Sequence, residues 1–275
     1  MQAAQEQDIP VVGHVPFEVG LQTVLEGGQV TIEHLSGYID PDAAQFVIPE
    51  EQLATNAELT REAGVWNCPT IGLYQNTVPP EEIGRLEAQP GVEYISPLMR
   101  VLMRFFIRQM NTSVSYTGPD YPARIDEIYT RMTRALHDAG AKVVLCTDTS
   151  NSYLVPGFSL LGELDNLIQA GLSPYEAIEA GTRNAAEALG KLDEFGTVEV
   201  GKRADLILLE EDPLMDVGKL RERSGVMLRG RWLAEEQLQS MLSGLAESHR
   251  PNPLERLWPL SLIGLVIYLI LRKER

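Results

Sequence analysis

Short apolar runs alternate with amphipathic segments through the first two thirds of the chain. Residues 9–13, 30–34, 64–71 and 141–147 have the pattern of strands. Helical patterns lie between them, around residues 17–26, over 41–63, and in a segment that ends at 135–140. This alternation predicts parallel strands joined by helices, and the continuous apolar runs suit strands that are covered on both faces. The sequence therefore predicts the α/β class.

Four such strands are half the number in an eight-stranded (β/α)8 barrel. Half a barrel leaves two open edges, which allows three arrangements: a missing upstream half, an open sheet, or assembly with another chain. The opening residues, MQAAQEQDIPVVGH, resemble the end of a helix that runs into a strand. We therefore expect residues 1–190 to be the downstream half of a partial TIM (β/α)8 barrel, containing its strands 5–8.

A long connection, from about residue 74 to 139, separates the third and fourth predicted strands. Within it an apolar stripe follows helical spacing, with arginines at every fourth position beside it. The stripe consists of Met99, Leu102, Met103, Phe106, Ile107 and Met110. We expect a helix that packs on the body of the domain. A lid over the site and a membrane-facing helix are the alternatives.

The segment after the fourth strand predicts a capped helix followed by β-structure. Residues 173–189 are helical in pattern, with Ser173 as N-cap, Pro174 in the first turn and Glu176 completing a capping box. Residues 196–209 are expected to form two short strands with a turn at 200–202. Residues 226–233 are expected to form a second hairpin. Residues 191–235 are thus expected to be the C-terminal part of a small β-sandwich.

The C-terminal end consists of a polar segment followed by an apolar one. Residues 236–256 are polar and helical in pattern at first, then proline-containing, which suits a linker. Residues 257–271 carry no charge and precede Arg272, Lys273 and Arg275. We expect this C-terminal hydrophobic helix to be a transmembrane tail that makes the protein membrane-associated, although a spanning helix needs about 20 apolar residues. A buried hydrophobic helix is the alternative, and the side of the membrane stays open.

Composition narrows the classes of partner. The chain has 275 residues, 44% of them hydrophobic, and a formal net charge of −16. Because no basic region is available to neutralise phosphates, we expect no nucleic-acid partner. Cys68 and Cys146 lie inside apolar runs and are expected to be buried free thiols, so they do not fix the compartment. Homo-oligomerisation stays open.

Two histidines and an aspartate follow strand-like runs in order. They are His14 in IPVVGHVP, His34 in VTIEHLSGY and Asp148 in KVVLCTDTSN. Neutral imidazoles and a carboxylate suit a borderline-soft divalent metal such as zinc. In a parallel barrel they would converge at the C-terminal rim. Glu33 should point to the opposite face of its strand and is not counted as a ligand.

Residues 181–214, GTRNAAEALGKLDEFGTVEVGKRADLILLEEDPL, resemble the C-terminal signature of the amidohydrolase superfamily. The VMLRGRW segment fits the same place, while TIEHL and TDTS resemble the sixth and eighth barrel strands. The imidazolonepropionase-like and prolidase-like branch is the most similar. The resemblance spans about residues 9–233 and implies a metal-dependent (β/α)8 barrel beside a small β-sandwich.

The resemblance also implies roles for single residues. His14 and His34 would be metal ligands, and Asp148 would both ligate metal and act as general base or proton shuttle. The family's first-strand histidine pair and its fourth-strand lysine or glutamate have no counterpart in this sequence. The implied cofactor is a divalent metal, Zn²⁺ by its chemistry, with one or two ions in the complete site.

The implied function is hydrolysis of amide-type C–N bonds in a small-molecule substrate, either non-peptide or dipeptide-like. A catalytically inactive, membrane-tethered scaffold or binding remnant is the alternative, because the ligand set is incomplete. A C–O or C–Cl hydrolase is a third possibility, since fold analogy alone does not choose the bond that is cleaved.

Overall fold

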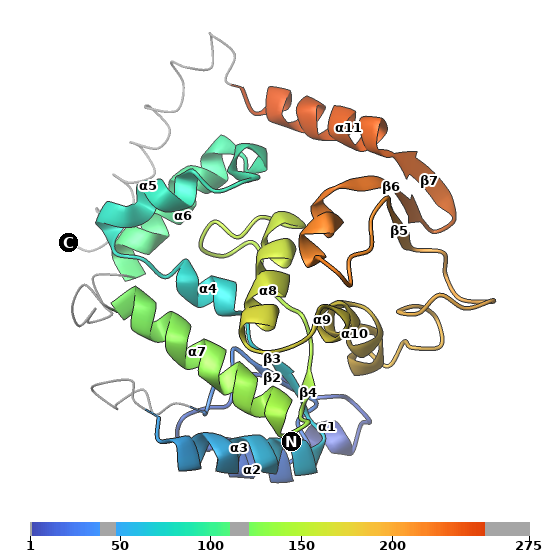
Figure 1. Cartoon of the computed structure of the whole chain (residues 1–275). Coiled ribbons are helices and arrows are strands. Elements are labelled where there is room, and N and C mark those ends of the chain that lie inside the picture. Colours follow the sequence, from blue (N-terminus) through green and yellow to red (C-terminus); the bar gives the residue numbers. More distant parts are fainter. Residues whose placement is uncertain (1, 39–47, 111–120, 251–275) are drawn as a thin grey trace.

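Four short parallel strands form the main sheet of the computed structural model, which describes residues 2–38, 48–110 and 121–250 (Figure 1). The strands are β1 (Val12–Gly13), β2 (Thr31–Glu33), β3 (Trp66–Cys68) and β4 (Lys142–Val143). They pair in chain order, β1-β2-β3-β4, and every pairing is parallel. The predicted alternation of strands and helices is confirmed, although each strand is shorter than its apolar run.

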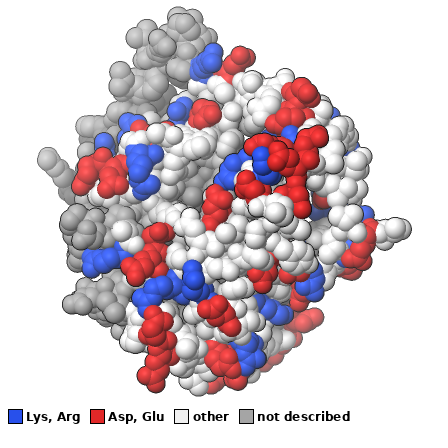
Figure 2. All heavy atoms as spheres, in the orientation of Figure 1, with Lys and Arg blue, Asp and Glu red and all other residues white. Residues whose placement is uncertain are grey.

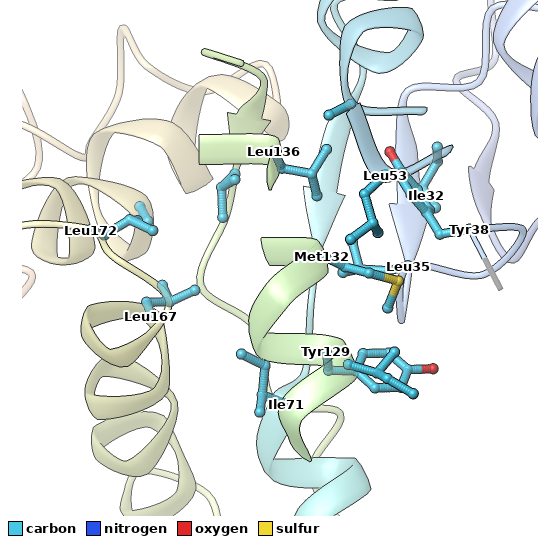
Figure 3. Close-up of a cluster of buried hydrophobic side chains, with 14 of the residues drawn as sticks. Ile32, Leu35, Tyr38, Leu53, Ile71, Tyr129, Met132, Leu136, Leu167 and Leu172 are labelled. Carbon is cyan, nitrogen blue, oxygen red and sulfur yellow. The ribbon is translucent and has the colours of Figure 1, made fainter. Parts of the chain in front are cut away.

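Helices connect the strands and cover one face of the sheet. Before β3 they are α1 (Gln2–Gln5), α2 (Leu21–Glu26) and α3 (Glu50–Ala63); α7 (Tyr121–Asp138) and α8 (Phe158–Gln169) flank β4 in the chain. The core lies between the sheet and these helices, where Ile32 of β2, Leu136 of α7 and Leu167 of α8 are fully buried (Figure 3). Burial of each such side chain contributes about 1.5–3 kcal/mol.

The long connection between β3 and β4 is mostly helical. It contains α4 (Ile71–Gln75), η1 (Pro80–Glu82), α5 (Ile83–Glu87), η2 (Val92–Tyr94) and α6 (Pro97–Met110) before α7. Met103 and Ile107 of α6 are buried in a second apolar cluster with Tyr153 and Val155. The predicted packing of this helix is confirmed for these two residues. Other apolar side chains of α6 are exposed: Leu98, Met99, Val101, Leu102, Phe105 and Phe106.

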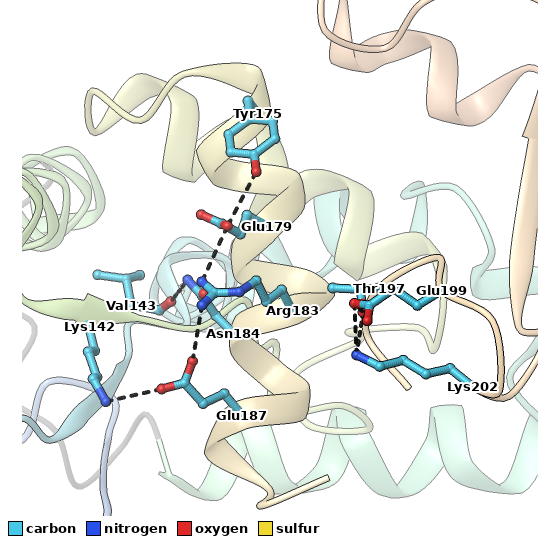
Figure 4. Close-up of polar contacts among 10 residues, drawn as sticks. All are labelled: Lys142, Val143, Tyr175, Glu179, Arg183, Asn184, Glu187, Thr197, Glu199 and Lys202. Carbon is cyan, nitrogen blue, oxygen red and sulfur yellow. Dashed lines mark hydrogen bonds and ion pairs between the residues drawn. The ribbon is translucent and has the colours of Figure 1, made fainter. Parts of the chain in front are cut away.

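Two helices follow α8 and pack against the outer edge of β4 (Figure 4). They are α9 (Pro174–Gly181), which begins with the predicted Ser173–Glu176 capping box, and α10 (Arg183–Ala188). The backbone N–H of Leu145 donates to the carbonyl of Ala180 at 3.1 Å. The Asn184 side-chain amide donates to the carbonyl of Val143 at 3.2 Å. The two helices therefore satisfy backbone groups that a neighbouring strand would otherwise occupy.

A separate antiparallel sheet follows, in the order β5-β6-β7. It consists of β5 (Leu206–Leu209), β6 (Arg223–Leu228) and β7 (Arg231–Ala234), with η3 (Val217–Arg221) before β6. The hairpin predicted at residues 226–233 is confirmed by the pairing of β6 with β7. The first predicted hairpin is wrong, because residues 196–205 contain no strand. Local side-chain contacts hold this loop instead, with Lys202 bound to Thr197 and Glu199 (Figure 4).

The described part of the segment predicted as a linker, residues 236–250, is helical as far as Ser248. Helix α11 (Glu235–Ser248) packs against β6 and β7, and the guanidinium of Arg223 pairs with Glu235 at 3.0 Å. The helical pattern expected at the start of this segment is confirmed, and the acidic first turn of α11 favours a helix start there. The apolar residues 257–271 lie outside the described part of the chain. Within the described part, no helix has the length and apolarity that a membrane crossing requires.

Acidic residues outnumber basic residues in the sequence, 39 to 23. On the face drawn in Figure 2, Lys and Arg side chains lie among Asp and Glu side chains. This distribution follows from the net charge of −16 and from short-range ion pairs such as Lys142–Glu187 and Arg221–Asp165. Exposed pairs of this kind contribute at most about 1 kcal/mol each to stability.

Candidate metal centre at the strand ends

The polar residues of interest follow the carboxyl ends of the four parallel strands. His14 comes directly after β1, His34 directly after β2, and Asp148 follows β4 after a short extended stretch. Parallel strands in one sheet bring their carboxyl ends to the same edge, which is where ligands bind in α/β folds. His14 and Asp148 are exposed, and His34 is half-buried.

The structure brings the two histidines into contact. Their ring centroids are 4.8 Å apart and their planes meet at 68°, in an edge-on arrangement. The ends of β1 and β2 are also joined by a hydrogen bond from the Val15 N–H to the Ser36 hydroxyl, at 2.7 Å. The carboxylate of Asp148 is close enough to act electrostatically on His34. The three residues therefore share one end of the sheet, with the imidazoles forming the closer pair.

The protonation of His34 suits a metal ligand. Burial lowers its pKa below the ordinary value and the charge of His14 acts in the same direction, whereas Asp148 and Glu33 act against them. A lowered pKa keeps the imidazole neutral at neutral pH, which is the form that binds metal.

A threonine fixes which nitrogen of His34 carries the proton. The hydroxyl of Thr70 lies 2.7 Å from Nδ1 of His34 and donates its own proton to the carbonyl of Pro69 at 2.7 Å. Because that proton is engaged, Thr70 accepts from Nδ1–H, and the lone pair of His34 is on Nε2. Such a partner on the second ring nitrogen is the usual support for a metal-binding histidine. The donor set thus fits a divalent metal.

Strained backbone conformations occur at the same strand ends. Several described non-glycine residues have positive φ angles, and three of them lie here: His34, Thr70 and Asp148, with φ of 60°, 51° and 56°. Each such conformation costs about 1–3 kcal/mol and persists where surrounding contacts over-determine it, most often at functional sites. One strained residue at the end of each of three neighbouring strands supports a site there.

A buried glutamate holds the turn that carries Thr70. The carboxylate of Glu163 on α8 accepts from the backbone N–H groups of Ile71 and Gly72 at 2.7 and 2.8 Å, and from Asn166 at 3.1 Å. Its side chain is almost fully buried, and burial raises its pKa against the opposing effect of these three donors. Glu163 thereby fixes the first turn of α4 directly after Thr70.

Sequence reasoning missed Thr70 and Glu163. Thr70 follows β3 in CPTI, and a hydroxyl at the end of the third strand was a usable signal. Glu163 lies in an ordinary helical pattern, and no local feature of the sequence indicates its burial.

We expect Thr70→Val to weaken divalent-metal binding by about 10–100-fold, because it removes the acceptor that orients His34. Calorimetric titration with Zn²⁺ measures this change. Thr77→Val is the matched control, since Thr77 lies just after α4 and its hydroxyl donates back to the Leu73 carbonyl at 3.1 Å. Thr70→Ser should restore the affinity, and an unchanged affinity in Thr70→Val would contradict this role.

The two cysteines differ from expectation. Cys68 and Cys146 are joined by a disulfide, with their Cα atoms 5.7 Å apart, so the prediction of free thiols is wrong. The reason is geometric: the ends of β3 and β4 are adjacent in the sheet, which the linear sequence did not reveal.

Among the described residues, the group of three potential ligands whose ligand atoms all lie within 4.8 Å of one another is Glu33, Cys68 and Cys146. His14, His34 and Asp148 are more widely spaced than that.

A large cavity lies away from these residues. Its volume is about 840 Å³, and it is lined by residues of α4, α8, β6 and α11, Tyr153 and Phe158 among them. Neither histidine nor Asp148 lines it. The cavity therefore does not identify a substrate pocket for the strand-end residues.

Comparison with known proteins identifies the family of the chain. A family model described as the amidohydrolase family matches residues 1–233. The chain belongs to the amidohydrolase family. Homologues in this family are hydrolases that typically bind a divalent metal. The α/β fold with a parallel sheet is also that of the solved relatives.

Individual relatives match parts of the chain. Imidazolonepropionase of Geobacillus sp. (strain WCH70) is 42% identical over 81 residues, which are 28% of this chain and 18% of that enzyme. Ochratoxinase of Aspergillus niger is 27% identical over 202 residues, which are 68% of this chain and 41% of that enzyme.

Solved structures match a larger share of this chain than the sequence relatives do. A bottromycin amidohydrolase superposes with a TM-score of 0.67 at 25% identity, covering 90% of this chain and 55% of that one. A Xaa-Pro dipeptidase with bound methionine superposes with a TM-score of 0.54 at 19% identity, covering 85% and 47% respectively, and supports the fold alone. The chain thus spans about half the length of these solved relatives.

Proposed function

We propose that this chain contributes one side of the divalent-metal centre of a hydrolase that cleaves amide-type C–N bonds. The observation that carries the proposal is the contact of His14 with a neutral His34 whose Nδ1–H is held by Thr70. We further infer that β1–β4 correspond to strands 5–8 of a (β/α)8 barrel. Their uninterrupted parallel order supports this correspondence.

His14 and His34 would hold the metal through neutral imidazole nitrogens, with Asp148 as a further oxygen ligand. Zn²⁺ suits this mixed nitrogen and oxygen set. A bound divalent ion lowers the pKa of water and polarises a carbonyl group, which is the chemistry that amide hydrolysis needs.

Asp148 has the position and chemistry of the proton carrier. Its carboxylate is exposed at the end of the sheet, beside the histidines, where it can accept a proton from an attacking water and deliver it to the leaving nitrogen. Its positive φ of 56° directs the backbone away from the strand at this point. Burial lowers the pKa of His34 and so favours its neutral form, while Nδ1–H bonds to Thr70.

The C–N bond is favoured over C–O and C–Cl bonds by the names of the relatives. Among these relatives, the bottromycin amidohydrolase, at 25% identity, is named for amide hydrolysis. A panel of Xaa-Pro dipeptides, N-acyl amino acids and a matched ester therefore tests the proposal.

We expect the complete Zn²⁺-loaded centre, of which this chain contributes one side, to hydrolyse an amide of this panel, chelation to remove the activity, and re-addition of metal to restore it. Product formation is followed by chromatography. Retention of amide hydrolysis after complete metal removal, or cleavage of the ester alone, would contradict the proposal.

A further inference from the structure

A second group of potential metal ligands lies near the carboxyl ends of the strands, and its member Glu33 directly precedes His34 in the sequence. Glu33 ends β2, Cys68 ends β3, and Cys146 follows β4. Glu33 and Cys68 are direct partners in the β2–β3 register, and Cys68 is bonded to Cys146. Three neighbouring strands thus each contribute one ligand-type side chain, and the three ligand atoms lie within 4.8 Å of one another.

The surroundings of this group are apolar. Cys68 is 4% exposed and packs in a small cluster with the buried Trp66 and Val144, with Ala188 of α10 against it. The Thr31 hydroxyl donates to Glu33 at 2.6 Å and fixes that carboxylate on the same face of the sheet. A disulfide with a purely structural role does not require a carboxylate such as that of Glu33 beside its sulfur atoms. Two sulfurs and a carboxylate oxygen together form the donor set of a thiophilic divalent cation.

We propose that the Cys68–Cys146 disulfide is the oxidised form of a second metal site. Two-electron reduction cleaves the S–S bond and gives two Cys thiols. With an external thiol, two reductant molecules supply the two protons and become one disulfide; with a phosphine, water supplies the two protons and the oxygen of the resulting phosphine oxide. Each thiol then loses one proton as its sulfur binds the cation, with Glu33 as the third ligand. The site takes Zn²⁺ or Cd²⁺, and the disulfide excludes both.

This site is distinct from the strand-end histidines. Glu33 and His34 are consecutive, and Glu33 is directed to Thr31 and the sulfurs while His34 is directed to Thr70. The proposal therefore stands whether or not His14, His34 and Asp148 bind a metal of their own.

Cadmium binding to the full chain tests the proposal, because thiolate-to-cadmium charge transfer gives an ultraviolet band that histidine and carboxylate ligands do not give. After reduction with a phosphine and its removal, a thiol assay should find both cysteines free. Titration with Cd²⁺ should then produce the band, saturating at one ion per chain. The oxidised chain should give no band.

Cadmium titration of single-residue variants tests which side chains bind the cation. Cys146→Ser should remove most of the band, and Glu33→Gln should keep the band but weaken Cd²⁺ affinity about tenfold or more. His34→Ala should leave the band unchanged. Circular dichroism checks that each variant is folded. Absence of the band in the reduced, folded chain, unaltered affinity in Glu33→Gln, or a disulfide that resists reduction until the chain unfolds would each overturn the proposal.

Discussion

Asp148→Asn is expected to lower kcat for amide hydrolysis by about 10²–10⁴-fold, the usual contribution of a positioned general acid–base group. Asparagine keeps the shape of the side chain and an oxygen that can still face a metal. It cannot accept and return a proton. The loss should therefore fall on kcat measured at saturating metal, whereas KM should change little.

The exposed Asp138 at the end of α7 provides a matched control, and Asp138→Asn should retain the wild-type rate. Metal content of both variants is measured in parallel, so that a loss of bound metal is separated from a loss of proton transfer. An Asp148→Asn chain that keeps both its metal and its rate would remove Asp148 from the chemistry.

Glu163→Ala is expected to lower the free energy of unfolding by about 2–5 kcal/mol. The substitution leaves the N–H groups of Ile71 and Gly72 without their acceptor, and each unsatisfied buried donor costs about 1–3 kcal/mol. Urea unfolding followed by circular dichroism measures the change. Asp165→Ala on the same helix is the control, because it removes only the exposed ion pair with Arg221 and should cost at most about 1 kcal/mol.

Glu163 also gives stability a defined pH dependence. Because burial raises its pKa in the folded protein, the folded state binds the proton more tightly than the unfolded state does. Its contribution is fully present below the unfolded pKa and is lost as the pH rises through the folded pKa. Relative to Glu163→Gln, the wild-type chain should lose stability over that range, and identical pH profiles would contradict this reasoning.

The strand order and the strand-end residues were accessible from the sequence because both depend on local pattern. Apolar runs define the strands, and a histidine or aspartate directly after a run must lie at its carboxyl end. The capping box at Ser173 is equally local, since its bonds join residues within one turn.

Features that depend on contacts between distant segments were not accessible. The Cys68–Cys146 disulfide joins residues separated by 78 positions, and Glu163 meets Ile71 across 92. The strand expected within residues 196–205 does not form, because strand formation also depends on a distant pairing partner. These residues have strand-like composition, but no neighbouring strand pairs with them in the described part of the chain. The helical pattern of α11 is local, whereas the packing of this helix on β6 and β7 depends on tertiary contacts.

The helices that follow α8 have a consequence for how this sheet behaves in solution. An exposed strand edge invites intermolecular β-pairing and aggregation. At β4 the groups that would seed such growth, the Val143 carbonyl and the Leu145 N–H, are already occupied by Asn184 and Ala180. Any strand arriving from another polypeptide, including one that would close a barrel, must first exchange these bonds for its own. These contacts therefore protect the edge at β4 from intermolecular strand pairing.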